Sequence, residues 1–215
     1  AEHDGTTVTG MRYDATRTPW TTCAAAGDVL QILVGAPLRP RATDAADITD
    51  PHHHCTHLFD LAGIAMASAA RGVEARRYDV EVPPPVDGSK IVRLWRDGTL
   101  LFAWTLTVDP SGVHTLVDPE PYSTVPWRGG FMRWADTTLD PDTAEAAIVL
   151  RRACEIGMGR GMPLDDIPVA SDLRRIMLGA CFTMQPDQID HAHRNRGNIR
   201  DFARIPQALL ADLGD

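Results

Sequence analysis

A helical pattern of apolar and small side chains lies within the first half of this 215-residue chain. Leu58, Leu61 and Ala65 recur at the spacing that places side chains on one face of a helix. Thr56 is a residue type favoured at helix starts, and Gly72 is a type favoured just beyond helix ends. The pattern therefore predicts a long helix that begins at Thr56 and is closed by Gly72.

The segments before this helix have a different pattern. Thr6 to Ala15 and Asp28 to Val34 are rich in β-branched and other apolar residues, which predicts two strands. Leu38 to Pro51 mixes proline, aspartate and arginine and predicts a long surface loop. Because long loops in compact domains are often functional, we consider this loop either as a lid or as a mobile segment.

After the helix, the period of the pattern changes to two. Glu74 to Val82 alternates between polar and apolar residues, and Val113 to Val117 adds a shorter strand pattern. Between them, Ile91 to Trp95 and Leu100 to Leu106 flank Asp97-Gly98, which supplies the positive φ angles of a tight hairpin turn. These four segments predict an antiparallel meander.

The final third of the chain is predicted to be helical. Asp140-Pro141 is a pair typical of helix starts, and the helix that it opens runs to Gly157. Further helices are predicted over Ser171 to Leu178 and from Gln185 to about Arg196. Together the patterns predict an α+β fold in a single domain over 1–215, with an antiparallel meander sheet packed by the long central helix and the C-terminal helices.

Composition narrows the classes of function. The chain is 44% hydrophobic and 23% charged, and its net charge of -8 argues against nucleic acid or an acidic membrane surface as a partner. No run of about 18 apolar residues is present, so we expect no membrane span. The four cysteines are scattered without a C-x-x-C pair, which favours a reducing cytoplasm over a disulfide framework.

Four of the eight histidines and one cysteine lie within six residues, from His52 to His57, at the predicted helix start. His53 and His57 stand four apart, as metal ligands do on a helix, but a metal site also needs remote ligands that the sequence does not identify. Cys55 near a helix N-terminus is a candidate nucleophile or a small buried residue. His57, oriented by Asp60 or by a backbone carbonyl, is a candidate general acid or base, or else a hydrogen-bonded structural residue.

The stretch from Pro119 to Trp134 combines aromatic residues, arginines and glycines in a pattern too broken for a long element. Its aromatic side chains are candidates to wrap an aromatic ligand, with arginine over a ring face. The alternative is a hydrophobic cluster beneath a loop.

Four short motifs are spread along the chain. They are Cys55-Thr56-His57-Leu58, Leu94-Trp95-Arg96-Asp97-Gly98, Gly130-Phe131-Met132-Arg133-Trp134 and Gly179-Ala180-Cys181-Phe182-Thr183. Together they resemble a bacterial family catalogued as domain of unknown function family 2889, over about Gly10 to Phe202. Common members of that family carry Glu where this chain has Asp60. The chain also resembles cofactor-free lyases that remove formaldehyde from lignin-derived aromatic dimers.

The resemblance implies a cofactor-independent carbon–carbon lyase acting on a hydrophobic, lignin-derived aromatic compound. In such a reaction we expect His57, oriented by Asp60, to take the proton of a primary alcohol. Tyr122, Arg133 and Arg151 are the candidates to stabilise the phenolate that forms. The substrate-binding candidates are His54, Cys55, Trp127, Phe131 and Trp134.

Two other functions stay open. One is a non-catalytic protein that binds a small aromatic ligand in the same pocket, and the other is a metal-dependent enzyme that uses the cluster from His52 to His57. For the leading hypothesis we expect no cofactor and no metal, and a small hydrophobic aromatic molecule as the ligand. We expect no nucleic-acid or membrane partner, and we consider a homodimer as the assembly.

Overall fold

The computed structural model describes residues 1–120, 122–198, 202, 204–205, 208–209 and 211. Contacts divide the chain into two compact units. Unit 1 comprises Ala1–Leu38, Asp44–Met66 and Pro163–Asp215, and unit 2 comprises Arg39–Thr43 and Ala67–Met162. Helices and antiparallel strands are both present, so the predicted α+β class is confirmed. That the whole chain folds as one domain stays a prediction.

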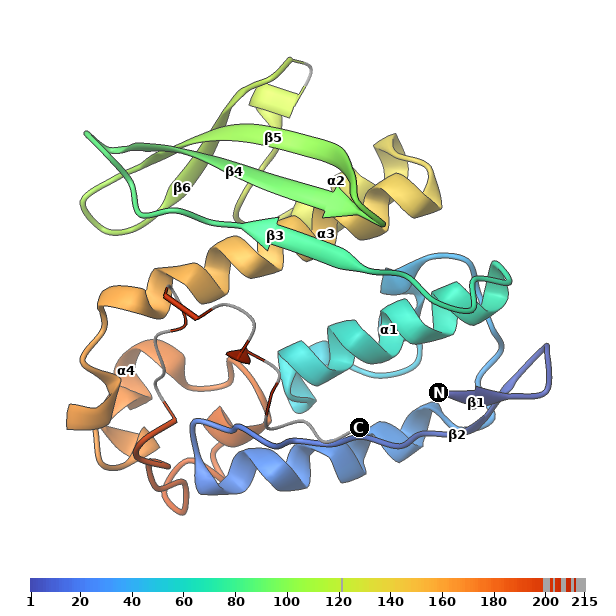
Figure 1. The fold of residues 1–215 in the computed structure, drawn as a ribbon. Helices are drawn as coiled ribbons and strands as arrows, with labels where there is room; N and C mark the ends of the chain where they lie inside the picture. Colours follow the sequence, from blue (N-terminus) through green and yellow to red (C-terminus); the bar gives the residue numbers. More distant parts are fainter. Residues whose placement is uncertain (121, 199–201, 203, 206–207, 210, 212–215) are drawn as a thin grey trace. The chain divides into compact units, whose positions relative to one another are not determined.

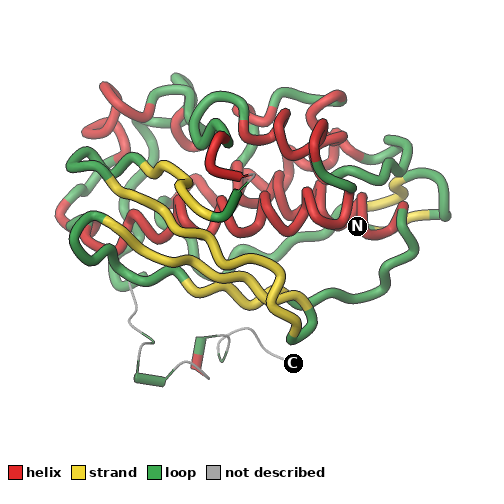
Figure 2. The backbone as a smooth tube through the Cα atoms, turned by 90° about the horizontal axis from the view of Figure 1, so that it is seen from above, coloured by secondary structure: helices red, strands yellow, loops and turns green. Residues whose placement is uncertain are grey.

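A four-stranded antiparallel meander forms the sheet of unit 2 (Figure 1, Figure 2). In pairing order its strands are β3 (Tyr78–Glu81), β4 (Ser89–Arg96), β5 (Thr99–Val108) and β6 (His114–Asp118). Asp97 and Gly98, with φ of 50° and 81°, connect β4 to β5, because both residues of this tight turn need positive φ. The predicted meander is thus confirmed, including its hairpin.

Two helices, α2 (Phe131–Thr138) and α3 (Pro141–Gly157), share a hydrophobic core with this sheet (Figure 1). Alternate strand residues such as Val92 and Leu94 are fully buried, because successive side chains of a strand point to opposite faces. The start of α3 is confirmed at the predicted place, since Asp140 accepts hydrogen bonds from the first backbone N–H groups. A 3₁₀ turn, η5 (Met158–Gly161), follows α3.

The sequence did not predict α2. The irregular stretch from Pro119 to Trp134 contains a 3₁₀ turn, η4 (Tyr122–Thr124), and the first half of α2. Phe131 and Ala135, four residues apart, are the buried positions of this short helix. A repeat of only two apolar positions is too short to separate from the aromatic residues around it, so the pattern indicated a loop.

The long helix α1 (Thr56–Ala70) begins at the predicted residue. At its other end Gly72 has a φ of 68°, and the N–H of Val73 donates to the carbonyl of Ser68 at 2.9 Å, as in a Schellman motif. Buried residues of α1, including Phe59 and Met66, pack in the core of unit 1 rather than in the core cluster of the sheet.

One predicted strand of unit 1 is wrong. Asp28 to Val34 belongs mostly to a 3₁₀ helix, η1 (Thr21–Leu33). Leu30 and Leu33 are buried whereas Ile32 is exposed, so burial follows a period of three and not of two. A short apolar run does not by itself distinguish a strand from a helix. In this segment the helical conformation buries Leu30 and Leu33 in one core cluster with residues of α1. Of Thr6 to Ala15, only β2 (Val8–Gly10) is a strand, and it pairs with β1 (Glu2–His3).

The rest of unit 1 consists of short turns. The predicted loop from Leu38 to Pro51 contains η2 (Ala42–Asp47) and is followed by η3 (Pro51–His53). The C-terminal turns are η6 (Leu164–Asp166), η7 (Ala170–Leu173), α4 (Arg174–Met177) and η8 (Phe182–Met184). The consecutive elements η7 and α4 span most of the residues for which a helix was predicted, Ser171 to Leu178. The helix predicted from Gln185 is wrong, because His193 and Arg194 form isolated bridges to Val169 and Trp20 instead.

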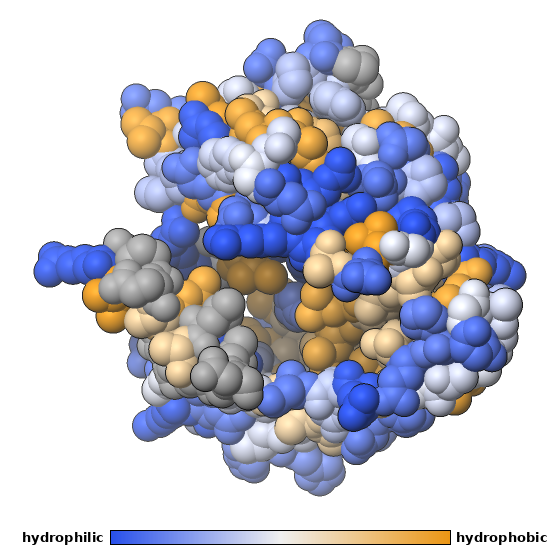
Figure 3. Space-filling view, turned by 45° about the vertical axis from the view of Figure 1, so that its right-hand side comes forward, coloured by the Kyte–Doolittle hydropathy of each residue, from blue (hydrophilic) through white to orange (hydrophobic). Residues whose placement is uncertain are grey.

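Hydrophilic side chains cover most of the face drawn in Figure 3, and apolar side chains form smaller patches there. Within the residues that the structure describes, no helix is long and apolar enough to cross a membrane.

Candidate functional site

The turn before α1 is held together by its own polar contacts. Asp50 accepts a hydrogen bond from the backbone N–H of His52 at 2.9 Å, and its Oδ1 lies 2.9 Å from the ring Nδ1 of His52. His54 is fully buried, with Nε2 3.1 Å from Thr49 Oγ1 and its ring 4.8 Å from that of Phe59. Burial lowers the pKa of His54, which keeps the ring neutral. The structure therefore gives His54 a packing role.

The histidines of this turn have separate surroundings. His52 contacts Asp50 and His54 faces the core, while His57 is exposed on α1. Across the described ranges of the chain, no three His, Cys, Asp or Glu side chains are placed to hold a metal ion. Closeness in sequence therefore does not bring these side chains together into a ligand set.

A groove of about 170 Å³ lies in unit 1 along α1. Most of its lining is apolar and comes from one face of α1, from η1 and from the segment after β2: Met11, Leu30, Leu58, Leu61, Ala62 and Ala65. Ala1, Arg12, Tyr13 and Asp14 complete the lining. The small side chains of Ala62 and Ala65 leave room where larger residues would fill the groove. An apolar lining with a few polar groups is typical of sites for small organic molecules.

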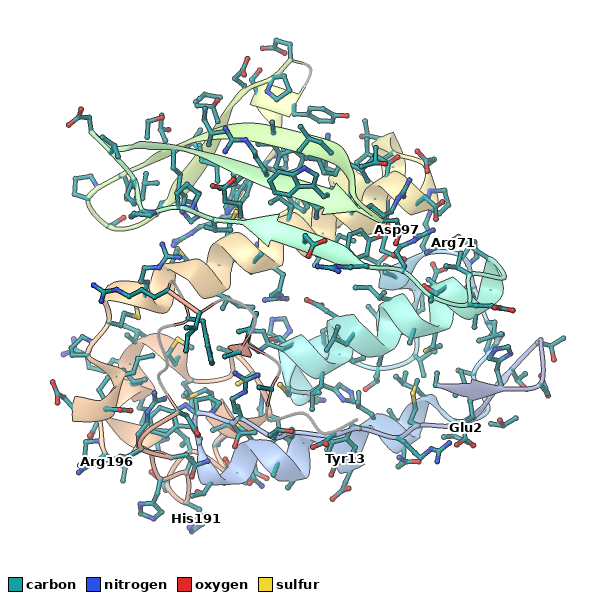
Figure 4. The ribbon with its side chains drawn as sticks, in the orientation of Figure 1. Glu2, Tyr13, Arg71, Asp97, His191 and Arg196 are labelled. Carbon is teal, nitrogen blue, oxygen red and sulfur yellow. The ribbon has the colours of Figure 1, made fainter. Side chains whose placement is uncertain are left out.

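Tyr13, labelled in Figure 4, provides the aromatic wall of this groove. Its hydroxyl donates to Asp28 at 2.9 Å, and this hydrogen bond raises the pKa of Tyr13. The ring lies directly against Gly27, where an added Cβ would come within 2.1 Å of it. The hydroxyl is thus protonated and already donating, so Tyr13 acts as a wall and not as a base.

His57 precedes lining residues of the groove along α1. It precedes Leu58 by one residue and Leu61 by four, and both of these line the groove. On an α-helix a residue four positions away lies one turn along the same side, so the side chain of His57 neighbours that of Leu61. Asp60, half-buried, lies three residues after His57. At about 100° per residue, Asp60 lies on the side of α1 opposite to the lining positions Leu58, Ala62 and Ala65, so the structure places His57, but not Asp60, next to a lining position.

Six of the other predicted site residues belong to unit 2, where the aromatic ones pack together. Trp127 and Phe131 are buried with their rings 5.7 Å apart, and Trp134 lies 5.3 Å from Phe131. Tyr122 lies 5.8 Å from Trp134. The alternative expectation of a hydrophobic cluster is thus confirmed for these rings.

Arg151 is tied to the same cluster. Its Nε donates to the carbonyl of Trp127 at 3.1 Å, its Nη2 lies 2.6 Å from Glu155, and its guanidinium lies 5.2 Å from the ring centre of Phe131. Arg133 is exposed on α2. That these unit 2 residues act on a substrate together with His57 stays a prediction.

Unit 1 also gathers three of the four cysteines. Cys23 Sγ lies 3.2 Å from Thr183 Oγ1, and the N–H of Phe182, which follows Cys181, donates to the carbonyl of His54, which precedes Cys55, at 2.9 Å. Burial raises the pKa of the Cys23 and Cys181 thiols. The sequence shows only that the cysteines are scattered along the chain, because no local pattern indicates that residues so distant in sequence meet.

Comparison with protein-family models, curated proteins and solved structures finds no match to this chain. The family resemblance of the four motifs therefore stays a prediction. The sequence also missed Tyr13 and the groove. The small side chains of α1, such as Ala62 and Ala65, were the available signal.

Proposed function

We propose that the protein is a cofactor-independent lyase that binds a small hydrophobic aromatic compound in the groove of unit 1 and releases formaldehyde from it. One observation carries the proposal: an apolar groove with an exposed histidine one helical turn from its lining residue Leu61. An apolar cavity of about 150 Å³ is known to hold benzene, so a groove of about 170 Å³ accommodates one aromatic ring. The second ring of a dimer would extend beyond it.

The reaction requires only a base that can later return its proton. His57 would remove the proton of a primary alcohol on the substrate, the bond to the carbinol carbon would break, and formaldehyde would leave. The electron pair passes to the aromatic part, which then takes the proton back from His57. Since R–CH₂OH becomes R–H and formaldehyde, no other reagent is consumed. Imidazole suits this role because it exchanges protons near neutral pH.

Arg12 and Tyr13 are the polar groups that we assign to substrate placement. Arg12 lines the groove, and its guanidinium contacts Glu2 at 2.5 Å while most of it is exposed. A guanidinium in this position would favour a phenolate, because a charge-assisted hydrogen bond strengthens as negative charge develops. Tyr13 would stack against the substrate ring.

A non-catalytic ligand-binding protein is the second candidate. The apolar lining favours it as much as it favours an enzyme, because the lining explains ligand affinity without any role for His57. The two functions therefore differ in one measurable property, which is the need for His57 in turnover but not in binding.

The test uses a phenolic dimer that carries a primary alcohol. The rate of formaldehyde release from this compound is measured, and its binding affinity is measured separately by calorimetry. His57→Ala should lower the rate by about 10² to 10⁴-fold and leave the affinity within about twofold. His53→Ala is the matched control, because His53 is an exposed histidine of the same turn outside α1. That variant should keep the wild-type rate.

Filling the groove separates binding from chemistry. Ala65→Phe should weaken the affinity and the rate together, with circular dichroism to verify the fold. Binding without any formaldehyde release by the wild type would establish the second candidate. Release by His57→Ala at the wild-type rate would contradict the assignment of the base.

A further inference from the structure

We propose that Cys55 and Cys181 are a redox-active pair that a hydroperoxide oxidises to a reversible disulfide. The proposal does not depend on the lyase activity. It rests on the alignment of two turns of unit 1, the turn before α1 and the turn that contains η8.

Two hydrogen bonds set this alignment. The N–H of Phe182 donates to the carbonyl of His54 at 2.9 Å, and the side-chain amide of Gln185 donates to the carbonyl of His52 at 2.8 Å. Residue numbers rise along one segment as they fall along the other, so the two segments run antiparallel. The next pair in this register is Cys55 and Cys181.

Between the two turns, the backbone is extended at His54 and at Cys181. His54 has φ -111° and ψ 165°, and Cys181 has φ -163° and ψ 178°. Residues opposite one another in antiparallel extended segments have Cα atoms about 4.5 to 5.5 Å apart. A disulfide spans Cα separations of about 4.4 to 6.8 Å, so the register suits a disulfide without a large movement of the backbone.

The two thiols have different surroundings. The carbonyl of Cys55 accepts the hydrogen bond of the Phe59 N–H at 2.9 Å, which makes Cys55 the cap of α1 and places its side chain at the positive end of the helix dipole. Both cysteines are half-buried, and burial raises the pKa of the Cys181 thiol. We therefore assign the first attack to Cys55 and the resolving step to Cys181.

The reaction balances with hydrogen peroxide as the oxidant. The Cys55 thiolate attacks a peroxide oxygen, the O–O bond breaks, and a sulfenic acid and hydroxide form. The Cys181 sulfur then attacks the sulfenic sulfur, the S–S bond forms and water leaves. Overall, two thiols lose two electrons and two protons, and the peroxide is reduced to two molecules of water.

Cys23 lies beside the pair but is held separately. Its Sγ lies 3.2 Å from the hydroxyl of Thr183, which also accepts a hydrogen bond from Thr22 at 3.1 Å. The Cys23 thiol thus contacts the hydroxyl of Thr183, whereas Cys55 is placed opposite Cys181 by the backbone hydrogen bond from Phe182 to His54. The pairing should therefore be selective.

The test uses the reduced full chain treated with an equimolar amount of hydrogen peroxide. Titration should show a fall from four free thiols to two, and peptide mapping without reductant should show a Cys55–Cys181 link that dithiothreitol removes. Cys55→Ser and Cys181→Ser should each abolish the link. Cys23→Ser and Cys154→Ser are the controls, and both should keep it.

Several results would overturn the proposal. They are a link that involves Cys23, a link between two chains, or four free thiols after treatment. Cys55→Ala and Cys181→Ala, compared with the wild type by circular dichroism, establish that a lost link does not reflect a lost fold. A lost link in a folded variant supports the pairing, and a retained link contradicts it.

Discussion

His114 on β6 is a buried side chain whose two ring nitrogens have no hydrogen-bond partner among the described residues. Only 3% of its surface is exposed, and its ring lies 5.6 Å from that of Trp127. Burial, and then the nearby charges of Lys90 and Arg128, lower the pKa of His114 to about 4. The residue thus behaves as an uncharged ring of the unit 2 core.

This lowered pKa makes the free energy of unfolding depend on pH. Below the ordinary value of 6.5 the unfolded chain binds a proton at His114, whereas the folded chain does so only near pH 4. Stability is therefore lost as pH falls through this window, by about 2 to 3 kcal/mol at pH 4.5. His114→Phe removes the titrating group and keeps an aromatic ring. Between pH 7 and 4.5 the free energy of unfolding of this variant should therefore fall by about 2 to 3 kcal/mol less than that of the wild type.

Urea unfolding at the two pH values measures this difference. His191→Asn, which replaces an exposed histidine, is the control. Its free energy of unfolding should change with pH as that of the wild type does. An equal loss in His114→Phe and the wild type would show that His114 is charged or hydrated in the folded protein.

At the scale of one element, the start of α3 depends on a single side chain. Asp140 Oδ1 accepts hydrogen bonds from the N–H groups of Asp142 and Thr143 at 3.0 and 3.1 Å. Asp140→Ala should lower the free energy of unfolding by about 1 kcal/mol, because these N–H groups lose their partner. Asp140→Asn keeps an acceptor oxygen and should cost less. Denaturant unfolding compares the two, and equal costs would contradict capping.

The elements that the sequence predicted correctly are those that neighbouring residues determine. Asp97-Gly98 specifies its own turn, and Asp140-Pro141 specifies its own helix start. The η1 segment was missed because Leu30 and Leu33 are buried by residues of α1 and not by their neighbours. The groove and the thiol pair were missed for the same reason, since each is assembled from segments far apart in the sequence.

At the scale of the whole molecule, distant segments of unit 2 are joined by a buried ionic network. The carboxylate of Glu145 on α3 has no exposed surface and accepts hydrogen bonds from Tyr78 at 2.6 Å, from Arg76 at 3.1 Å and from Arg71. Arg71, labelled in Figure 4, also donates to the carbonyl of Pro40. The network thereby connects the segment Arg39–Thr43, the entry to β3, and α3.

Removing the centre of this network should be costly. Glu145→Gln removes the fully buried carboxylate of the network and leaves Arg71 and Arg76 with Asp142, at 2.9 and 3.1 Å, as their remaining counter-charge, so it should lower the free energy of unfolding by up to about 3 kcal/mol. Glu81→Gln breaks a surface pair with Arg93 at 3.0 Å and should cost less than about 1 kcal/mol. Thermal and urea unfolding of both variants tests the contrast, and similar costs would refute it.

The division of unit 1 into three stretches of chain has a consequence for its synthesis. Trp20 is buried against Ala170, Met184, Ile189 and Ala192, which the ribosome adds much later. At a synthesis rate of roughly 5 to 20 residues per second, these partners are added about 8 to 30 s after Trp20. Unit 2, nearly all within Ala67–Met162, is complete before then. During synthesis, the apolar residues around Trp20 therefore lack their later partners while the stretch Ala67–Met162 is already made, and we expect the nascent chain to expose this apolar surface during that interval.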